Sequence, residues 1–342
     1  ILDVRDHSVL QLSKLNLEVG EVIAWSPSGE FLATGEGQAI RIAAANAQTV
    51  CHLTGHLGVV ERISWLDNER LVSSSQDQTI RVWDISKQLL VDTLKIHDAP
   101  VRDIVINHDG SRLLSASDGT IRISNLQTVP QERVMRISTG NSSELEATAL
   151  NSSVHTNWIT ELKWQGNGSR ICAVGEDSQG ASFLGELGVW NPVSSRPVNA
   201  YDTKLCRGLA WSPDGTQVFR ATTGNKLVAE DVRTGSLIQS NLCALFGNPI
   251  AFWSPSTKYV ATYGGNAPPY VRNSYDAVSL ADRGGASGSR GHAVAWSPSE
   301  SRCIAGGWRK PMIIDLNGAR IAFPDLESID SFAIAWHPSE KF

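Results

Sequence analysis

The stretch GHLGVVERISWLDNERLVSSSQDQTIRVWD, from Gly55 to Asp84, contains the pattern that decides the fold. Its runs VVERISW, RLVSSS and TIRVWD are rich in β-branched and small residues, which is typical of short strands, and polar turn residues separate them. A weaker fourth run, LLVDTL, follows from Leu89. None of these runs has the period of an amphipathic helix. The stretch therefore predicts four short antiparallel strands joined by tight turns.

The same arrangement recurs along the whole chain. A turn rich in Pro, Gly and Ser, such as SPSG at Ser26 or SPDG at Ser212, follows the first strand of most copies. A further copy has Ile106 where the others have tryptophan. The tryptophans that end the first strand of a copy are Trp25, Trp65, Trp164, Trp211, Trp253, Trp296 and Trp336. Their spacing, mostly about 40–45 residues with turn signals inside each copy, indicates the blades of a β-propeller.

The copy from Gly55 to Asp84 resembles a repeat of the WD-repeat family, which has Gly-His before its first strand and Trp-Asp at the end of its third. The resemblance implies a buried, hydrogen-bonded set within the blade. Its members here are His56, Ser73, Asp77 and Trp83. Such a set is physically necessary, because a buried imidazole and a buried carboxylate are costly unless they satisfy each other.

The other copies retain less of this set, although the resemblance extends over essentially the whole chain. The next copy has His97, Ser115 and Asp118, but Ser124 stands at the position of the tryptophan. Trp190 begins a degenerate Trp-Asn version of the Trp-Asp pair. One copy is therefore strong and the rest are recognised by their strand pattern.

Two terminal fragments bear on the number of blades. ILDVRD at Ile1 aligns with a third strand, and SFAIAWHP at Ser331 aligns with a first strand. Joining them in one blade would remove two exposed sheet edges. We therefore expect a single all-β domain over residues 1–342, a propeller of eight four-stranded antiparallel blades closed by N- and C-terminal strands in one blade. Seven blades is the alternative, and it requires the Gly-rich copy from Gly265 to Gly291 to be an insertion.

Composition narrows the classes of partner. The chain is 41% hydrophobic and 19% charged, an ordinary globular balance. Its net charge of −5 provides no basic excess to neutralise phosphates, so we expect no nucleic acid partner. We expect no membrane contact, because no apolar run reaches the roughly 18 residues of a membrane helix. The five cysteines are scattered and never paired as C-x-x-C, which predicts neither disulfides nor zinc and favours the cytoplasm.

Sequence signatures of catalysis are missing. The chain has no G-x-S-x-G, no H-E-x-x-H and no phosphate-binding G-x-x-x-x-G-K-[ST] motif. The repeat itself accounts for His56 and His97, and His337 lies in a WHPS turn. We therefore expect no enzyme activity, no catalytic residue, no metal and no cofactor.

Partner contacts are expected in the variable loops. Loops between second and third strands and between copies differ in length, and in the resembled family they share one rim, called the top. The residues predicted to contact a partner there are Trp158, Trp308, Arg309, Tyr270 and Glu176. Aromatic and arginine side chains are frequent interface anchors. The alternative is that these aromatic rings cap the barrel or pack on a neighbouring blade.

Two other features of the loops stay open. Residues 139–157 form a polar extension that is either a plain surface insertion or a binding loop. Glu36, Asp118, Glu176 and Asp177 lie near turns, where they could bind a basic peptide or simply form the turns.

These observations predict a protein-interaction platform or sensor module that binds a protein or peptide on the top rim. The resemblance also implies that such propellers often stand at the end of larger signalling or ATPase proteins, and a start and stop within a repeat fit a part of a longer multidomain protein. The alternative function is a propeller enzyme or small-ligand binder, which requires titratable groups to converge on the central channel.

Overall fold

The structure is a computed structural model, and in the residues it describes every regular element is a β-strand. Those residues contain no helix with the length and hydropathy to cross a membrane. The described residues are 22–46, 48–118, 120–126, 133–136, 157–165, 170–177, 184–190, 197–204, 206–222, 226–234, 236–242, 250–263, 270–273, 279–281, 291–307, 312–316, 320–322 and 334–339.

The strands pair in sequence order into four-stranded antiparallel sheets, seven in the described part of the chain. The chain divides into two compact units, one made of residues 1–95 and 245–342 and the other of residues 96–244. The all-β class and the antiparallel four-stranded copies predicted from the sequence are therefore confirmed.

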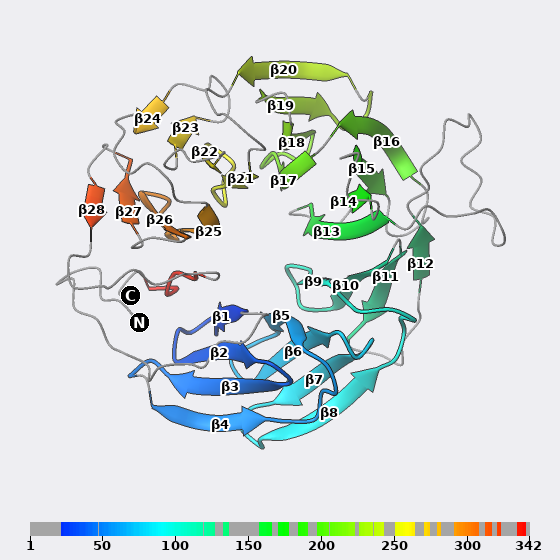
Figure 1. The fold of residues 1–342 in the computed structure, drawn as a ribbon, viewed down its shortest axis with the longest axis vertical. Helices are drawn as coiled ribbons and strands as arrows, with labels where there is room; N and C mark the ends of the chain where they lie inside the picture. The colour runs from blue at the N-terminus through cyan, green and yellow to red at the C-terminus, as the bar shows by residue number, and fades with distance from the viewer. Residues whose placement is uncertain are drawn as a thin grey trace. The chain divides into compact units, whose positions relative to one another are not determined.

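The first unit contains four of these sheets (Figure 1). The first two are β1 (Ile23–Trp25), β2 (Phe31–Glu36), β3 (Ala39–Ala44), β4 (Thr49–Leu53), and β5 (Val60–Trp65), β6 (Arg70–Ser75), β7 (Ile80–Asp84), β8 (Leu89–Leu94). The other two are β21 (Ile250–Trp253), β22 (Tyr259–Tyr263), β23 (Tyr270–Asn273), β24 (Ser279–Ala281), and β25 (Gly291–Trp296), β26 (Arg302–Gly307), β27 (Met312–Asp315), β28 (Arg320–Ala322).

The second unit contains the remaining three sheets. They are β9 (Asp103–Ile106), β10 (Arg112–Ser117), β11 (Thr120–Asn125), β12 (Arg133–Arg136); β13 (Asn157–Trp164), β14 (Ile171–Asp177), β15 (Leu184–Trp190), β16 (Pro197–Lys204); and β17 (Cys206–Trp211), β18 (Gln217–Thr222), β19 (Lys226–Asp231), β20 (Leu237–Leu242).

The turns after the first strands have a shared geometry. In the turn that joins β1 to β2, the Gly29 amide donates to the Ser26 carbonyl at 2.9 Å and Gly29 has a φ of +76°. Gly215 repeats both features between β17 and β18, with a 2.8 Å bond to Ser212 and a φ of +69°. Glycine suits these positions because a positive φ costs it little.

Tryptophans at the ends of first strands connect successive sheets within each unit. The indole Nε1 of Trp65 donates to the Ala24 carbonyl at 3.1 Å, so β5 is joined to β1. The same bond joins Trp164 to Val105, Trp211 to Lys163, Trp296 to Phe252 and Trp336 to Ala295. In each case the acceptor immediately precedes the residue that aligns with the donor tryptophan. The repeat is therefore held together by a sheet-to-sheet bond that recurs in register.

In the sheet β5–β8 the second and third strands contribute fully buried core residues. Leu71 in β6 and Ile80 in β7 are fully buried, whereas Leu89, Leu90 and Val91 on the outermost strand β8 are exposed. Residues 265–291, which the seven-blade alternative treats as an insertion, contain β23 and β24 of a four-stranded sheet. This copy is therefore a regular member of the repeat.

Candidate functional site

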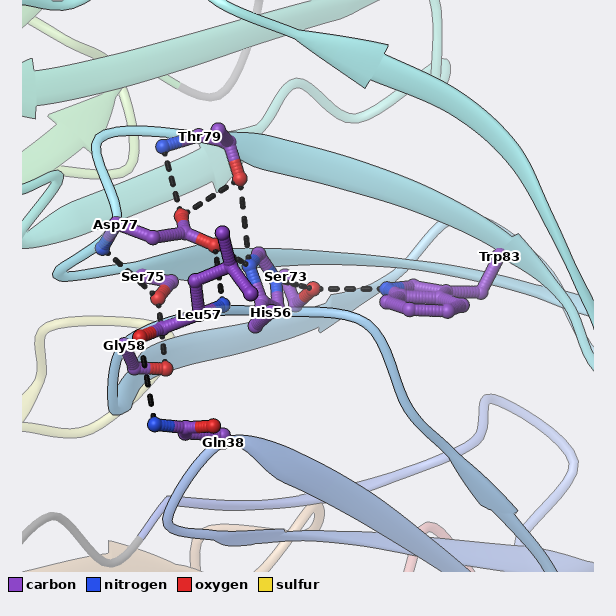
Figure 2. Close-up of polar contacts among 9 residues, drawn as sticks. All are labelled: Gln38, His56, Leu57, Gly58, Ser73, Ser75, Asp77, Thr79 and Trp83. Carbon is purple, nitrogen blue, oxygen red and sulfur yellow. Dashed lines mark hydrogen bonds and ion pairs between the residues drawn. The ribbon is translucent and has the colours of Figure 1, made fainter.

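The buried polar set of the sheet β5–β8 extends from the turn after β6 to Trp83 in β7 (Figure 2). His56 precedes β5, Ser73 lies in β6, Asp77 lies in the turn after β6, and Trp83 lies in β7. The His56 Nε2 is 2.8 Å from the Ser73 hydroxyl and its Nδ1 is 2.9 Å from Asp77 Oδ2. The Trp83 indole N–H donates to the Ser73 hydroxyl at 2.8 Å. The structure thus brings together all four residues that the sequence grouped.

The donors and acceptors of this set determine its protonation. Because the Ser73 oxygen accepts from Trp83, its own hydrogen can be donated to Nε2 of His56. His56 then carries its hydrogen on Nδ1 and donates it to Asp77. The chain of bonds therefore runs in one direction, from Trp83 through a neutral imidazole to an ionised carboxylate, and a partner satisfies each member.

The surroundings lower the pKa of both His56 and Asp77. Burial lowers the pKa of His56, and its bond to Asp77 offsets this in part. Burial by itself would raise the pKa of Asp77, but hydrogen bonds from the Thr79 hydroxyl, the Leu57 amide and His56 outweigh it and hold that pKa well below its usual range. Asp77 is therefore a fixed negative charge at neutral pH.

That charge fixes an exposed loop. Asp77 Oδ2 accepts from the Leu57 amide at 2.9 Å, and the Leu57 carbonyl accepts from Gln38 of the neighbouring sheet at 3.3 Å. The Ser75 hydroxyl donates to the next carbonyl, that of Gly58, at 2.9 Å. Between these bonds, the Leu57 side chain is 80% exposed (Figure 2). The buried set thus holds an apolar side chain in solvent, a feature that the sequence pattern did not reveal.

The next sheet, β9–β12, has a reduced version of the set. His97 Nε2 is 2.8 Å from the Ser115 hydroxyl, as in the complete set. Its Nδ1 is near the Thr120 hydroxyl, while Asp118 lies 3.5 Å from Arg102. The turn is one residue shorter than the turn at Asp77, so the carboxylate occupies another position. Burial and the nearby Arg122 charge lower the pKa of His97 to about 4.

The sheet β17–β20 replaces the set with a buried ion pair. Arg220 and Glu230 occupy the positions of Ser73 and Trp83, because Val218 pairs with Glu230 as Leu71 pairs with Trp83. The Arg220 guanidinium donates to both Glu230 oxygens, at 2.5 and 3.2 Å. The two side chains are 10% and 8% exposed. From the sequence we predict only that this copy lacks the His–Ser–Asp–Trp set. The opposite charges of Arg220 and Glu230 at two of its positions are a signal for the ion pair that replaces it.

The structure pairs two of the five predicted contact residues on adjacent strands. Trp158 in β13 and Glu176 in β14 are directly opposite each other in the strand register. Tyr270 is the first residue of β23. Trp308 and Arg309 lie outside the described residues, as does residue range 139–156 of the polar extension.

Two of the four loop carboxylates contact an arginine, and the other two lie at the end of β14. Glu36 lies 3.0 Å from Arg41, a contact within its own sheet, and Asp118 has its contact with Arg102. Glu176 and Asp177 end β14. Within the described ranges, no three His, Cys, Asp or Glu residues are grouped as a metal site would require.

The four-stranded sheets, their recurring sheet-to-sheet bonds and the His–Ser–Asp–Trp set define a β-propeller repeat protein. Comparison with known families agrees, since the family described as "WD domain, G-beta repeat" matches residues 47–84 and 88–124. The two matched repeats, together with the relatives below, support a WD-repeat β-propeller family.

Several curated proteins are similar to parts of the chain. Target of rapamycin complex subunit LST8 of Saccharomyces cerevisiae is 38% identical over 32% of this chain and 34% of its own length. Periodic tryptophan protein 2 homolog of Schizosaccharomyces pombe is 31% identical over 45% of this chain and 19% of its own length. Nuclear distribution protein PAC1 of Komagataella phaffii is 31% identical over 37% of this chain and 27% of its own length. The chain thus matches about a third or less of each relative.

Proposed function

We propose that this chain is a non-catalytic platform that binds a protein or peptide on the rim formed by the variable loops. The observation that carries the proposal is the rigid presentation of Leu57. Its loop is tied by bonds to Asp77 and Gln38, yet its side chain is 80% exposed. An apolar side chain held in solvent by a buried polar set can bind a partner without a large loss of loop entropy.

Two further observations support a protein partner. Trp158 and Glu176 are neighbours across β13 and β14, at the end of the sheet that borders the variable loop. The relative LST8 of Saccharomyces cerevisiae is, by its name, a subunit of a complex. We extend this to the present chain as a proposal of a protein partner and a cytoplasmic location, with Trp158, Glu176, Tyr270, Trp308 and Arg309 as further contacts.

The test is affinity capture with matched variants. The chain is immobilised and incubated with extract of its source cells, and bound proteins are quantified by mass spectrometry. A Trp158→Ala/Trp308→Ala variant and a separate Leu57→Ala variant are expected to lose at least tenfold of a specific bound protein. Leu89→Ala is the control, because Leu89 is an exposed leucine on the outer strand β8, away from the rim.

Unchanged recovery with both rim variants would contradict the proposed surface. Equal losses with Leu89→Ala and the rim variants would also contradict it, since the binding would then follow general hydrophobic exposure. Circular dichroism of each variant establishes that the sheets are intact.

We also propose that residues 1–342 are one domain with eight blades. The support is a segment beyond the seventh sheet: Trp336 makes the same indole–carbonyl bond, at 2.7 Å to Ala295, that first-strand tryptophans make elsewhere. An experimental structure of the chain tests the number directly, and a ring of seven sectors with residues 334–339 outside it would overturn the proposal.

A further inference from the structure

Residues 334–339 contact two different sheets of the first unit. Through Trp336 the segment is bonded to Ala295 in β25. Through the next residue, His337, it reaches the opposite end of the chain, because His337 Nε2 lies 2.9 Å from the carbonyl oxygen of Gly29. Gly29 lies in the turn between β1 and β2, and the segment lies beside β1 (Figure 1). Two adjacent side chains thus join β25–β28 to β1–β4.

The imidazole of His337 is held firmly in this position. Its Nδ1 accepts a hydrogen bond from the Ser339 amide at 3.1 Å and lies 2.7 Å from the Ser339 hydroxyl. Nε2 therefore carries the hydrogen and donates it to Gly29. The ring also meets Trp25 edge-on, with centroids 4.8 Å apart, and His337 is only 5% exposed. Both ring nitrogens of His337 are thus hydrogen-bonded, and the ring itself packs against Trp25.

The second unit contains the same joint between two complete sheets. Gln165 follows Trp164 as His337 follows Trp336, and it donates through Nε2 to the Gly215 carbonyl at 3.0 Å. Gly215 occupies in its turn the position that Gly29 occupies in the first turn. Because Trp164 ends the first strand of the sheet β13–β16, the equivalent residues 334–337 stand where a first strand stands.

We propose that His337 is the clasp of this propeller, fastening residues 334–339, as the innermost strand of a terminal sector, to the turn at Gly29. The clasp joins residues 308 positions apart in the sequence. This side-chain bond connects residues 334–339 to the sheet β1–β4. Opening it would release the C-terminal segment while leaving the seven sheets paired.

A substitution at Gly29 would disturb the contact with His337. A Cβ added at Gly29 would lie 2.2 Å from His337 Nε2, so an alanine there must displace the imidazole. Gly37 has a similar positive φ, +60°, but an added Cβ would meet nothing within 4 Å. Gly37→Ala therefore carries the backbone strain of the substitution without the collision.

The experiment is a double-mutant cycle with this control. Urea midpoints are measured for the full chain, for Gly29→Ala and His337→Ala singly and together, and for Gly37→Ala. We expect Gly29→Ala to lower the midpoint clearly more than Gly37→Ala does. In the His337→Ala background the added effect of Gly29→Ala should shrink to that of Gly37→Ala. Equal effects of Gly29→Ala in both backgrounds would overturn the proposal.

Hydrogen exchange gives a second, independent measurement on native protein. His337→Ala should speed amide exchange in residues 334–339 at least tenfold while leaving β5–β8 unchanged. His337→Gln should restore most of the protection, because glutamine makes the bond in the equivalent joint at Gln165. Unchanged exchange in His337→Ala, or no rescue by glutamine, would refute the clasp even if Gly29→Ala failed to fold.

Discussion

The buried ion pair between Arg220 and Glu230 should have a large energetic effect when one partner is removed and a small effect when both are removed. Their side chains are 10% and 8% exposed, so water cannot replace a lost partner. Removal of one partner from a buried pair costs about 3–5 kcal/mol, because the other charge stays buried and uncompensated. Replacing both by apolar residues is often neutral or stabilising.

The assay is a double-mutant cycle of Arg220→Met, Glu230→Met and both together. Urea unfolding is followed by tryptophan fluorescence, to which Trp211 of the same sheet contributes. Each single variant is expected to lose about 3 kcal/mol, and the double variant should lie within about 1 kcal/mol of the parent. The matched control is Arg70→Met, which breaks a pair with Asp67 whose side chains are 52% and 42% exposed. It should cost less than about 1 kcal/mol.

Either of two outcomes would refute this reasoning. If Arg220→Met costs no more than Arg70→Met, or if the double variant is as unstable as the sum of the singles, then the two charges are not coupled in the folded sheet. The inference that an ion pair replaces the Ser–Trp contact in this blade would then fail.

Three further predictions concern the buried contacts of the other blades. Asp77→Asn should lower stability by about 2 kcal/mol, since an amide cannot replace the acceptors used by four donors, whereas exposed Asp67→Asn should cost less than about 1 kcal/mol in the same urea titration. His97 is buried in its neutral form with a pKa of about 4 against 6.5 when unfolded, so the unfolded chain binds the extra proton and stability falls as pH drops from about 6.5 to about 4. Over that range the free energy of unfolding falls by about 3 kcal/mol. In His97→Gln the unfolding midpoint should depend less on pH, and an unchanged pH dependence would contradict the assignment. Trp296→Phe should cost about 1–2 kcal/mol by leaving the Phe252 carbonyl, its partner at 2.9 Å, without its indole donor, and a thermal melt indistinguishable from the parent would argue against sheet-to-sheet bonding.

Local patterns were sufficient for the architecture. The alternation of β-branched runs with Pro- and Gly-containing turns specifies strands and hairpins over a few residues, which is why the four-stranded copies followed from inspection of the chain. The Gly-His and Trp-Asp pairs mark fixed positions in one repeat, so the sequence by itself groups His56, Ser73, Asp77 and Trp83.

Contacts between copies required the folded chain. The bond from His337 to Gly29 joins residues 308 positions apart, and no local signal specifies which turn a histidine will meet. The pairing of Arg220 with Glu230 depends on strand register, and Asp118 was misplaced in the alignment by a turn one residue shorter. Short-range preferences act within each strand and turn, whereas packing between sheets determines which side chains meet, because that choice depends on the register and relative position of whole elements.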